Sequence, residues 1–390
     1  MRVAIDAQTL LRQNAGVTYY TKGLVEEVLK QDRRNHYDLL LWRLFPKPPV
    51  FMFGKEQNFF YRYQRFFPYR FFYKLHKWGI NIPLEVFFPP SARASAGEGR
   101  YDLYFFPDFV IYPHRFGRSV VVVHDLSFEK TPQFVFKENV KFLKKFVPLS
   151  VRQADRVIAI SENTKEDLRE VYGIPEEKVT VINPGVDLKV FRPQGREEAT
   201  QIKNKYGITR PFILYLGTID SRKNVAALVR AYANLRDRTR YQLVLAGKVG
   251  WTYEHQIDRE VQEVVKNLKL EEDVIFTGYT PDEDRPKLLS ACEVFVFPSF
   301  FEGFGMPVVE AQACGAPVVA SNTTSLPEAA GAAAVLVDPR NEGELGEAIR
   351  NVLGSPKLQE DLRRRGFENS RRFRWEDSAV KLMRVFYSLG

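Results

Sequence analysis

Two glutamates, Glu302 and Glu310, flank a glycine-rich turn in the run 297–310, which reads FPSFFEGFGMPVVE. The residues before the turn are apolar and β-prone, and the proline after it suits the first turn of a helix, so a strand and a helix are expected to meet here. Gly303 and Gly305 allow the backbone to approach a ligand closely, and unpaired N–H groups at a helix start favour phosphate or a polyol. Because a carboxylate further along the helix can accept hydrogen bonds from vicinal hydroxyls, the arrangement suits a sugar nucleotide.

The spacing of these acids, glutamate then seven residues then glutamate, resembles the signature of the GT-B glycosyltransferases of family four, which are retaining nucleotide-sugar enzymes. The resemblance extends to Leu216–Asn224 (LGTIDSRKN), to Val121–Leu126 (VVVHDL), and to the opening Ile5–Ala7 with Gly16. For the spacing alone, a solvated helix face is the simpler explanation. The intervening Gly-Phe-Gly-Met-Pro favours the family, and only residues from about 45 to 100 lack an obvious counterpart.

Strand-like and helix-like segments alternate along most of the chain, which predicts parallel sheets covered by helices on both faces. In the first half we expect strands at 2–6, 38–42, 102–106, 119–124, 156–160 and 178–182, and helices at 17–30, 137–153 and 162–172. In the second half we expect strands at 212–216, 242–246, 274–277, 294–297, 317–320 and 334–337. The turn-rich stretch 184–210 is predicted to link the two halves.

The fold that the resemblance implies is α/β, GT-B, with two Rossmann-like doubly wound parallel-sheet domains facing across a cleft. Residues 1–190 would form an N-terminal acceptor-binding domain and residues 208–372 a C-terminal nucleotide-sugar-binding domain. The resemblance also implies that the last helix, 375–390, packs back on the first domain, whereas its amphipathic period says only that it packs somewhere. Ligands in open α/β sheets bind beyond the carboxyl ends of the strands, where the motifs fall.

Arg222 and Lys223 follow the first strand of the second half, where two fixed cations would stabilise a departing nucleoside diphosphate. Lys223 falls at the lysine position of the family. Thr218 stands where an arginine often follows the strand glycine, so Arg222 is expected to reach in from a shifted position. The alternative is a pair of solvated turn residues.

His124 ends the apolar strand Val120–Val123. The resemblance implies that its imidazole lies in the catalytic pocket beside the donor sugar, as a hydrogen-bonding group rather than a proven general base. The alternative is a capping or core histidine. Some members have a second histidine where this chain has Phe106, which bears on contacts with the acceptor.

The resemblance assigns the sugar to Glu302 and the backbone of 303–306, the diphosphate to Arg222 and Lys223, and the ribose to Glu310. The catalytic residues are then His124, Glu302, Arg222 and Lys223. The donor-binding residues are Gly16, Gly217, Arg222, Lys223, Gly278, Tyr279, Glu302, Gly303, Phe304, Gly305, Met306 and Glu310. Gly278 and Tyr279 would border the base, although an ordinary strand-to-helix turn explains them equally well, and Gly16 is a single glycine where members often have two.

Asp282 and Asp284 have the Asp-x-Asp spacing that holds a divalent metal in a different class of glycosyltransferase. Helix capping explains the pair more simply, and the Arg-Lys pair already supplies the charge of a metal, so no metal and no other cofactor is expected. Cys292 and Cys314 are interpreted as small core residues because no Cys/His cluster has metal-ligand spacing.

Hydrophobic residues make up 45% of the 390 residues and charged residues 27%, which is typical of a soluble globular protein. The formal net charge of +9 suits anionic partners, but no zinc-ligand pattern or RNA-binding signature supports nucleic acid. The opening residues lead directly into strand-like sequence without an export signal, so a cytoplasmic location is expected. The oligomeric state is not predicted.

Residues 59–73 are dense in aromatic residues and arginine and contain no acid. Such a segment suits a lipid interface, so residues 59–77 are a candidate contact with an anionic membrane surface on its inner face, or a groove for a lipid-linked acceptor. The alternative is a hairpin that packs between domains or in a dimer.

The favoured function is transfer of a hexose, with mannose as the best guess, from a nucleoside diphosphate sugar to a hydroxyl of a glycan or lipid-linked acceptor in polysaccharide synthesis. One alternative is an NAD-dependent oxidoreductase, but the turn at Gly303 has valine where the third glycine of the dinucleotide fingerprint belongs. Another is a non-catalytic scaffold that binds a sugar nucleotide or lipid.

Overall fold

The computed structural model describes residues 1–11, 16–43, 58–90, 100–248 and 256–390. The chain divides into two compact units, the first made of Met1–Gly185 with Trp375–Gly390 and the second of Val186–Arg374. Each unit contains one sheet whose strand pairs are all parallel, so the predicted α/β class with two parallel-sheet domains is confirmed.

The first unit contains a seven-stranded sheet in the order β3-β2-β1-β4-β5-β6-β7. Its strands are β1 (Arg2–Asp6), β2 (His36–Trp42), β3 (Phe59–Gln64), β4 (Leu103–Phe106), β5 (Arg118–Val123), β6 (Arg156–Ala159) and β7 (Val179–Val181). Its helices are α1 (Gly16–Gln31), α2 (Tyr69–Lys77), α3 (Leu84–Phe87), α4 (Ser127–Lys130), α5 (Lys137–Gln153), α6 (Glu162–Tyr172) and α15 (Trp375–Tyr387). The strand order reverses between β1 and β4, and ligands of doubly wound sheets bind at such a point.

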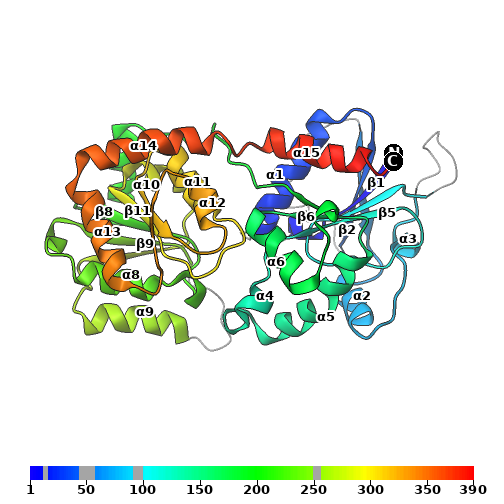
Figure 1. Cartoon of the computed structure of the whole chain (residues 1–390), viewed down its shortest axis with the longest axis horizontal. Coiled ribbons are helices and arrows are strands. Elements are labelled where there is room, and N and C mark those ends of the chain that lie inside the picture. Colours follow the sequence, from blue (N-terminus) through cyan, green and yellow to red (C-terminus); the bar gives the residue numbers. More distant parts are fainter. Residues whose placement is uncertain (12–15, 44–57, 91–99, 249–255) are drawn as a thin grey trace. The chain divides into compact units, whose positions relative to one another are not determined.

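The last helix, α15, packs along α1, so the end of the chain belongs to the first unit (Figure 1). The Trp375 indole lies edge-on to the Tyr20 ring at 6.0 Å. Near the other end of α15, the Tyr387 hydroxyl donates to the Asp32 carboxylate over 3.0 Å. A glycine in α1, Gly23, leaves the space that the indole occupies.

The second unit contains a six-stranded sheet in the order β10-β9-β8-β11-β12-β13. Its strands are β8 (Phe212–Leu216), β9 (Gln242–Ala246), β10 (Val274–Gly278), β11 (Val294–Phe297), β12 (Val318–Ser321) and β13 (Val335–Val337). Its helices are α7 (Arg196–Tyr206), α8 (Val225–Ala233), α9 (Gln256–Asn267), α10 (Arg285–Ala291), α11 (Met306–Ala313), α12 (Leu326–Ala330), α13 (Glu342–Gly354) and α14 (Pro356–Ser370). Figure 1 shows α10, α11 and α14 on one side of the sheet and α8 and α9 on the other.

Two segments differ from their sequence interpretation. The stretch 184–210 is not a bare linker, because it contains α7, which buries Ile202 and ends at Gly207 in the left-handed conformation. Residues 59–77 do not form a hairpin. They form the edge strand β3, which pairs in parallel with β2, followed by α2.

Most other elements match the prediction closely, and α5 and α6 have the predicted bounds.

Cys292 and Cys314 are free and buried, as expected of core residues. Within the described ranges, no helix has the length and apolar character needed to cross a bilayer.

Substitution of Gly23 by alanine tests the packing of α15 on α1. The added Cβ overlaps the partly buried Trp375 ring, so we expect Gly23→Ala to lose about 1–3 kcal/mol of unfolding free energy, measured by urea titration. Gly354→Ala is the matched control, because Gly354 ends α13 with open space around it. Equal stability of the two variants would contradict this packing.

Candidate active site

The cationic pair and the first glutamate are brought together by neighbouring strands of the second sheet. β8 and β11 pair in parallel, with Val294 opposite Ile213, so the loops that follow them leave the same edge of the sheet. The loop after β8 forms a short 3₁₀ turn at 221–223, in which the Asp220 carboxylate accepts a hydrogen bond from the Lys223 amide over 3.1 Å. The loop after β11 carries Glu302.

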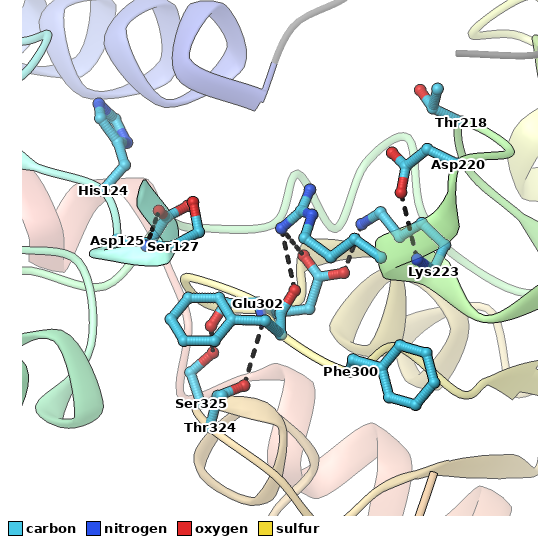
Figure 2. Close-up of polar contacts among 12 residues, drawn as sticks. His124, Asp125, Ser127, Thr218, Asp220, Lys223, Phe300, Glu302, Thr324 and Ser325 are labelled. Atoms are coloured by element: carbon cyan, nitrogen blue, oxygen red, sulfur yellow. Dashed lines mark hydrogen bonds and ion pairs between the residues drawn. The ribbon is translucent and has the colours of Figure 1, made fainter. Parts of the chain in front are cut away.

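Both cations converge on the carboxylate of Glu302 (Figure 2). The Lys223 ammonium group forms an ion pair with Oε1, and Arg222 Nη1 lies 3.5 Å from Oε2. Arg222 Nη1 also donates to the Phe301 carbonyl over 2.9 Å, while the Phe300 amide donates to the Arg222 carbonyl over the same distance. Arg222 is therefore held against Glu302 and the backbone of 300–301 and is not a solvated turn residue, while its contact with a diphosphate stays a prediction.

The protein environment keeps Glu302 ionised. Its side chain is buried, and burial by itself would raise its pKa. The charges of Lys223 and Arg222 outweigh burial, so the pKa of Glu302 lies below its usual value. The site therefore combines one buried anion, Glu302, with two fixed cations, while the Asp220 carboxylate lies on the Lys223 backbone amide.

Glu310, the second acid of the motif, has a different partner. It lies in α11, where its Oε2 forms an ion pair with Arg285, the first residue of α10. Burial raises the pKa of Glu310, although Arg285 acts in the opposite direction. Sequence analysis did not identify Arg285, but a cation at a helix N-terminus is unfavourable there and can indicate a specific partner.

The turn between the two acids depends on Gly305. Its φ of +107° is a conformation that glycine adopts readily, and a Cβ would come within 2.6 Å of Leu326 Cδ2. Phe304 packs its ring edge-on against Phe373 at 5.1 Å, so its side chain belongs to the core and only its backbone is available. Helix α11 begins at Met306 with Pro307 in its first turn, as expected.

The remaining donor-site candidates of this unit follow β8 and β10. Gly217 comes directly after β8, and its amide donates to the Ala246 carbonyl over 2.9 Å. Gly278 ends β10 with a φ of +66°, and Tyr279 is 47% exposed. Lys248, which sequence analysis did not identify, lies with its ammonium group 4.5 Å from the centre of the Tyr279 ring.

His124 follows β5 in the first unit and is buried. Its Nε2 lies 2.8 Å from the Pro107 carbonyl, which can only accept, so Nε2 carries the hydrogen. Burial lowers the pKa of His124, so the imidazole is neutral near pH 7 and Nδ1 is an acceptor. Tyr20 and Phe109 hold the ring, each with its centroid 5.3 Å away.

Gly16 begins α1, and a Cβ there would meet nothing within 4 Å. Residues 12–15, which precede it, lie outside the described residues.

The Asp-x-Asp pair is engaged in ion pairs, and the capping explanation for Asp284 was wrong. Asp284 precedes α10 but makes no side-chain cap hydrogen bond, because its carboxylate accepts from Lys205 and Tyr206 of α7. Asp282 lies 3.5 Å from Arg285. Over the part of the chain that the structure describes, no three His, Cys, Asp or Glu side chains form a group that could hold a metal ion.

Removal of Lys223 tests whether it balances the buried Glu302. Lys223→Met leaves Arg222 as the remaining cation at the carboxylate, so we expect the second unit to lose about 3 kcal/mol at pH 7 in urea unfolding. The folded-state pKa of Glu302 is depressed, so its stabilisation is present above its ordinary pKa of 4.5 and is lost as the pH falls through the folded-state value. The difference from wild type should therefore shrink at acidic pH.

Lys30→Met provides the control for this experiment. Lys30 forms a half-exposed ion pair with Glu26, and loss of such a pair typically changes stability by less than about 1 kcal/mol. A loss for Lys223→Met no larger than this control, or one that does not depend on pH, would contradict the assignment.

Comparisons with known proteins agree with this architecture. A family model described as glycosyl transferases group 1 matches residues 198–369, and one described as glycosyltransferase family 4 matches residues 47–190. O-antigen chain mannosyltransferase B of Escherichia coli is 31% identical over 287 residues, which are 73% of this chain and 74% of the relative. The serotype-specific mannosyltransferase WbdA of Escherichia coli is 32% identical over 230 residues, which are 58% of this chain and 28% of WbdA.

Sucrose-phosphate synthase from Thermosynechococcus elongatus has a similar structure, with a TM-score of 0.75 and 22% identity over 100% of this chain and 99% of that one. Anabaena HepE, solved in complex with UDP and glucose, has a TM-score of 0.73 and 18% identity over 100% of both chains. At these identities the two structures support the fold alone. The family models and the first relative decide the family: the chain belongs to the glycosyltransferases of family 4, is a glycosyltransferase, and has the GT-B fold.

Proposed function

We propose that this glycosyltransferase moves a hexosyl unit, with mannose preferred, from a nucleoside diphosphate sugar to a hydroxyl of a growing cell-surface glycan or its lipid-linked precursor. The anomeric configuration is retained. Two E. coli relatives are mannosyltransferases by name, which supports the choice of sugar, and GDP is the favoured nucleotide. The observation that carries the proposal is the pair of cations, Arg222 and Lys223, held against Glu302 at the carboxyl edge of the second sheet.

In this proposal Arg222 and Lys223 bind the diphosphate. Their side chains share one carboxylate, that of Glu302, so these three side chains together retain one positive charge for phosphate oxygens. Protein contacts set both positions before a ligand arrives, since Arg222 also donates to a backbone carbonyl. Preorganised charge of this kind stabilises a leaving group whose negative charge grows as its bond to the sugar breaks, by roughly 3–4 kcal/mol for a single donor in other enzymes.

The rest of the second domain, 208–372, completes the proposed donor site. Glu302 and the backbone of 303–306 bind the sugar. Arg285 holds Oε2 of Glu310, and Oε1 accepts hydrogen bonds from the ribose hydroxyls. Gly217 allows close approach to the phosphates, while Gly278, Tyr279 and Lys248 border the base.

The first domain, 1–190, is proposed to bind the acceptor. His124 contributes a neutral imidazole whose Nδ1 accepts a hydrogen bond from a substrate hydroxyl. This role needs no protonation of the ring, which is consistent with the pKa lowered by burial. Gly16, at the start of α1, remains a proposed donor-binding residue of this domain.

A panel of GDP-, UDP-, ADP- and dTDP-sugars tests the donor. The preferred donor should raise the thermal midpoint most, because a ligand of the folded state stabilises it, and should be turned over with an acceptor glycan. Turnover is expected to persist in EDTA. Binding without transfer or hydrolysis of any donor would favour a non-catalytic scaffold, and loss of turnover in EDTA with rescue by magnesium would contradict metal independence.

Two substitutions test the donor residues. Lys223→Ala is expected to lower kcat/KM by about 100- to 1000-fold, because a preorganised charge on the leaving group is lost. Glu310→Ala is expected to weaken donor affinity. Lys30→Ala and Glu26→Ala are matched controls from an exposed ion pair, and unchanged donor affinity and turnover in both site variants would refute the assignments.

We further propose that residues 59–77 attach the enzyme to the cytoplasmic face of an anionic membrane. The apolar side chains of Phe66 and Phe71, and of Trp78 and Ile80 just after this segment, are exposed by 95%, 47%, 68% and 50%, which is uncommon for four large residues so close in sequence. Arg65, Arg70, Lys74 and Lys77 are exposed among them, and residues 58–84 contain no acid. These eight residues are called the aromatic-basic face.

The orientation of α2 explains why the part of this face that lies on the helix is exposed to solvent. Phe72 and His76 point into the core, where Phe72 stacks on Trp42 at 4.6 Å and His76 lies 4.5 Å from Phe146, centre to centre. At 3.6 residues per turn, positions 70, 71, 74, 77 and 78 fall on the other side, within about a third of the circumference. Aromatic rings prefer the headgroup region and cations attract anionic lipid, so a membrane surface fits both features.

Vesicle flotation tests this attachment. We expect binding to phosphatidylcholine vesicles that contain phosphatidylglycerol, weaker binding without it, and release by salt. Arg70→Gln with Lys74→Gln should lower partitioning roughly 30-fold, at about 1 kcal/mol per charge. Phe66→Ser with Trp78→Ser should also release the protein, whereas Phe276→Ser, at an exposed site of the second unit, should not. Equal flotation of all variants would refute the proposal.

A further inference from the structure

Three consecutive hydroxyls after β12 hold the backbone of the loop that carries Glu302. The Glu302 amide donates to Thr324 Oγ1 over 3.1 Å, and Ser325 Oγ donates to the Glu302 carbonyl over 2.8 Å. Thr323 Oγ1 donates to the Phe300 carbonyl over 3.2 Å. Both backbone polar groups of Glu302 are therefore satisfied by side chains of one neighbouring loop.

The Thr324 and Ser325 hydroxyls contact Glu302 from the side away from Lys223 (Figure 2). β12 pairs with β11, Val319 opposite Val296, so the two loops emerge next to each other. The carboxylate is pulled toward the cations while the amide and carbonyl of the same residue are held by the β12 loop. Contacts with the backbone of Glu302 and contacts with its carboxylate thus together determine the direction of its side chain.

Thr324 makes its contact from a strained backbone. Its φ is +53°, and among the described non-glycine residues with positive φ it is the one with a β-branched side chain. Such a conformation is a genuine outlier for a branched residue, whereas glycine would adopt it freely. Glycine, however, has no hydroxyl to accept the Glu302 amide. The strain is therefore retained at the residue that supplies this contact.

We infer that Thr324 is a positioning residue for transfer: its hydroxyl anchors the amide of Glu302 and thereby directs the carboxylate at Lys223 and Arg222. The inference rests on the proposed role of Glu302 in binding the donor sugar. Thr324 acts through Glu302 and is not assigned any contact with the substrate. Ser325 supports the same residue at its carbonyl.

Two substitutions separate the hydroxyl from the shape of the side chain. Thr324→Val keeps the branched shape and the strain but removes the acceptor, and it should lower kcat roughly 10- to 100-fold because small displacements of a positioning group are costly. Thr324→Ser keeps the hydroxyl and should retain kcat within a few fold. The assays are run well below the thermal midpoints, and folding is verified by circular dichroism. Under these conditions a purely stabilising role of Thr324 predicts equal kcat in the wild type, Thr324→Val and Thr324→Ser.

A double-mutant cycle tests whether Thr324 acts through Glu302. In a Glu302→Gln background, Thr324→Val should cause little further loss, because the group that it positions has already been changed. The same fold loss in both backgrounds would overturn the inference. Wild-type kcat in Glu302→Gln alone would instead refute the proposed role of Glu302, so the two failures are distinguishable.

A crystal structure of Thr324→Val provides a readout that does not depend on activity. We expect the Glu302 carboxylate to move away from the Lys223 ammonium group. Retention of the wild-type ion pair in this variant would overturn the inference, even if no donor in the panel were turned over.

Discussion

A buried carboxylate cannot remain ionised without partners, and this constraint organises the second unit around Glu302. Its two cations come from one loop, the 3₁₀ turn that contains Arg222 and Lys223, and its backbone is held by another, the loop after β12. A charge taken out of water loses several kcal/mol of solvation unless such contacts replace it. The loops after three neighbouring strands are therefore tied to one residue, which limits how each of them can move.

A second buried acid of this unit, Glu310, also has a charged partner. Glu310 is paired with Arg285 across α11 and α10, and α11 is in turn joined to α14 by buried amides. Asn369 Nδ2 donates to Gln312 Oε1 over 2.7 Å, and Gln312 Nε2 donates to the Ala330 carbonyl over 2.9 Å. A helix held in this way presents its N-terminal turn and Glu310 in fixed positions. In the proposed donor site, binding would then require little reorganisation of charge, and a preorganised site gains most from this.

The first unit places its functional features on one scaffold as well. His124 directly follows β5, and its ring lies against the rings of Tyr20 of α1 and Phe109. Helix α15 also packs on α1, so the end of the chain supports the helix that contacts His124. The aromatic-basic face lies at the β3 edge of the same sheet, so both features share one core. Attachment to a membrane and contact with the acceptor are thus proposed for one domain.

By itself the sequence determined the α/β class, the positions of nearly all strands along the chain and the family, because buried parallel strands and glycine-rich turns leave strong local signals. It also marked Glu302, Arg222 and Lys223 as candidates. It did not determine that Arg285 pairs with Glu310, that Thr324 holds the Glu302 amide, or that Asp284 binds α7 instead of capping α10. Each of these contacts joins residues more than 20 positions apart, and only the sheet order brings their loops together. Charge pairing in a folded interior depends on which side chains burial leaves within reach, and no local pattern encodes that.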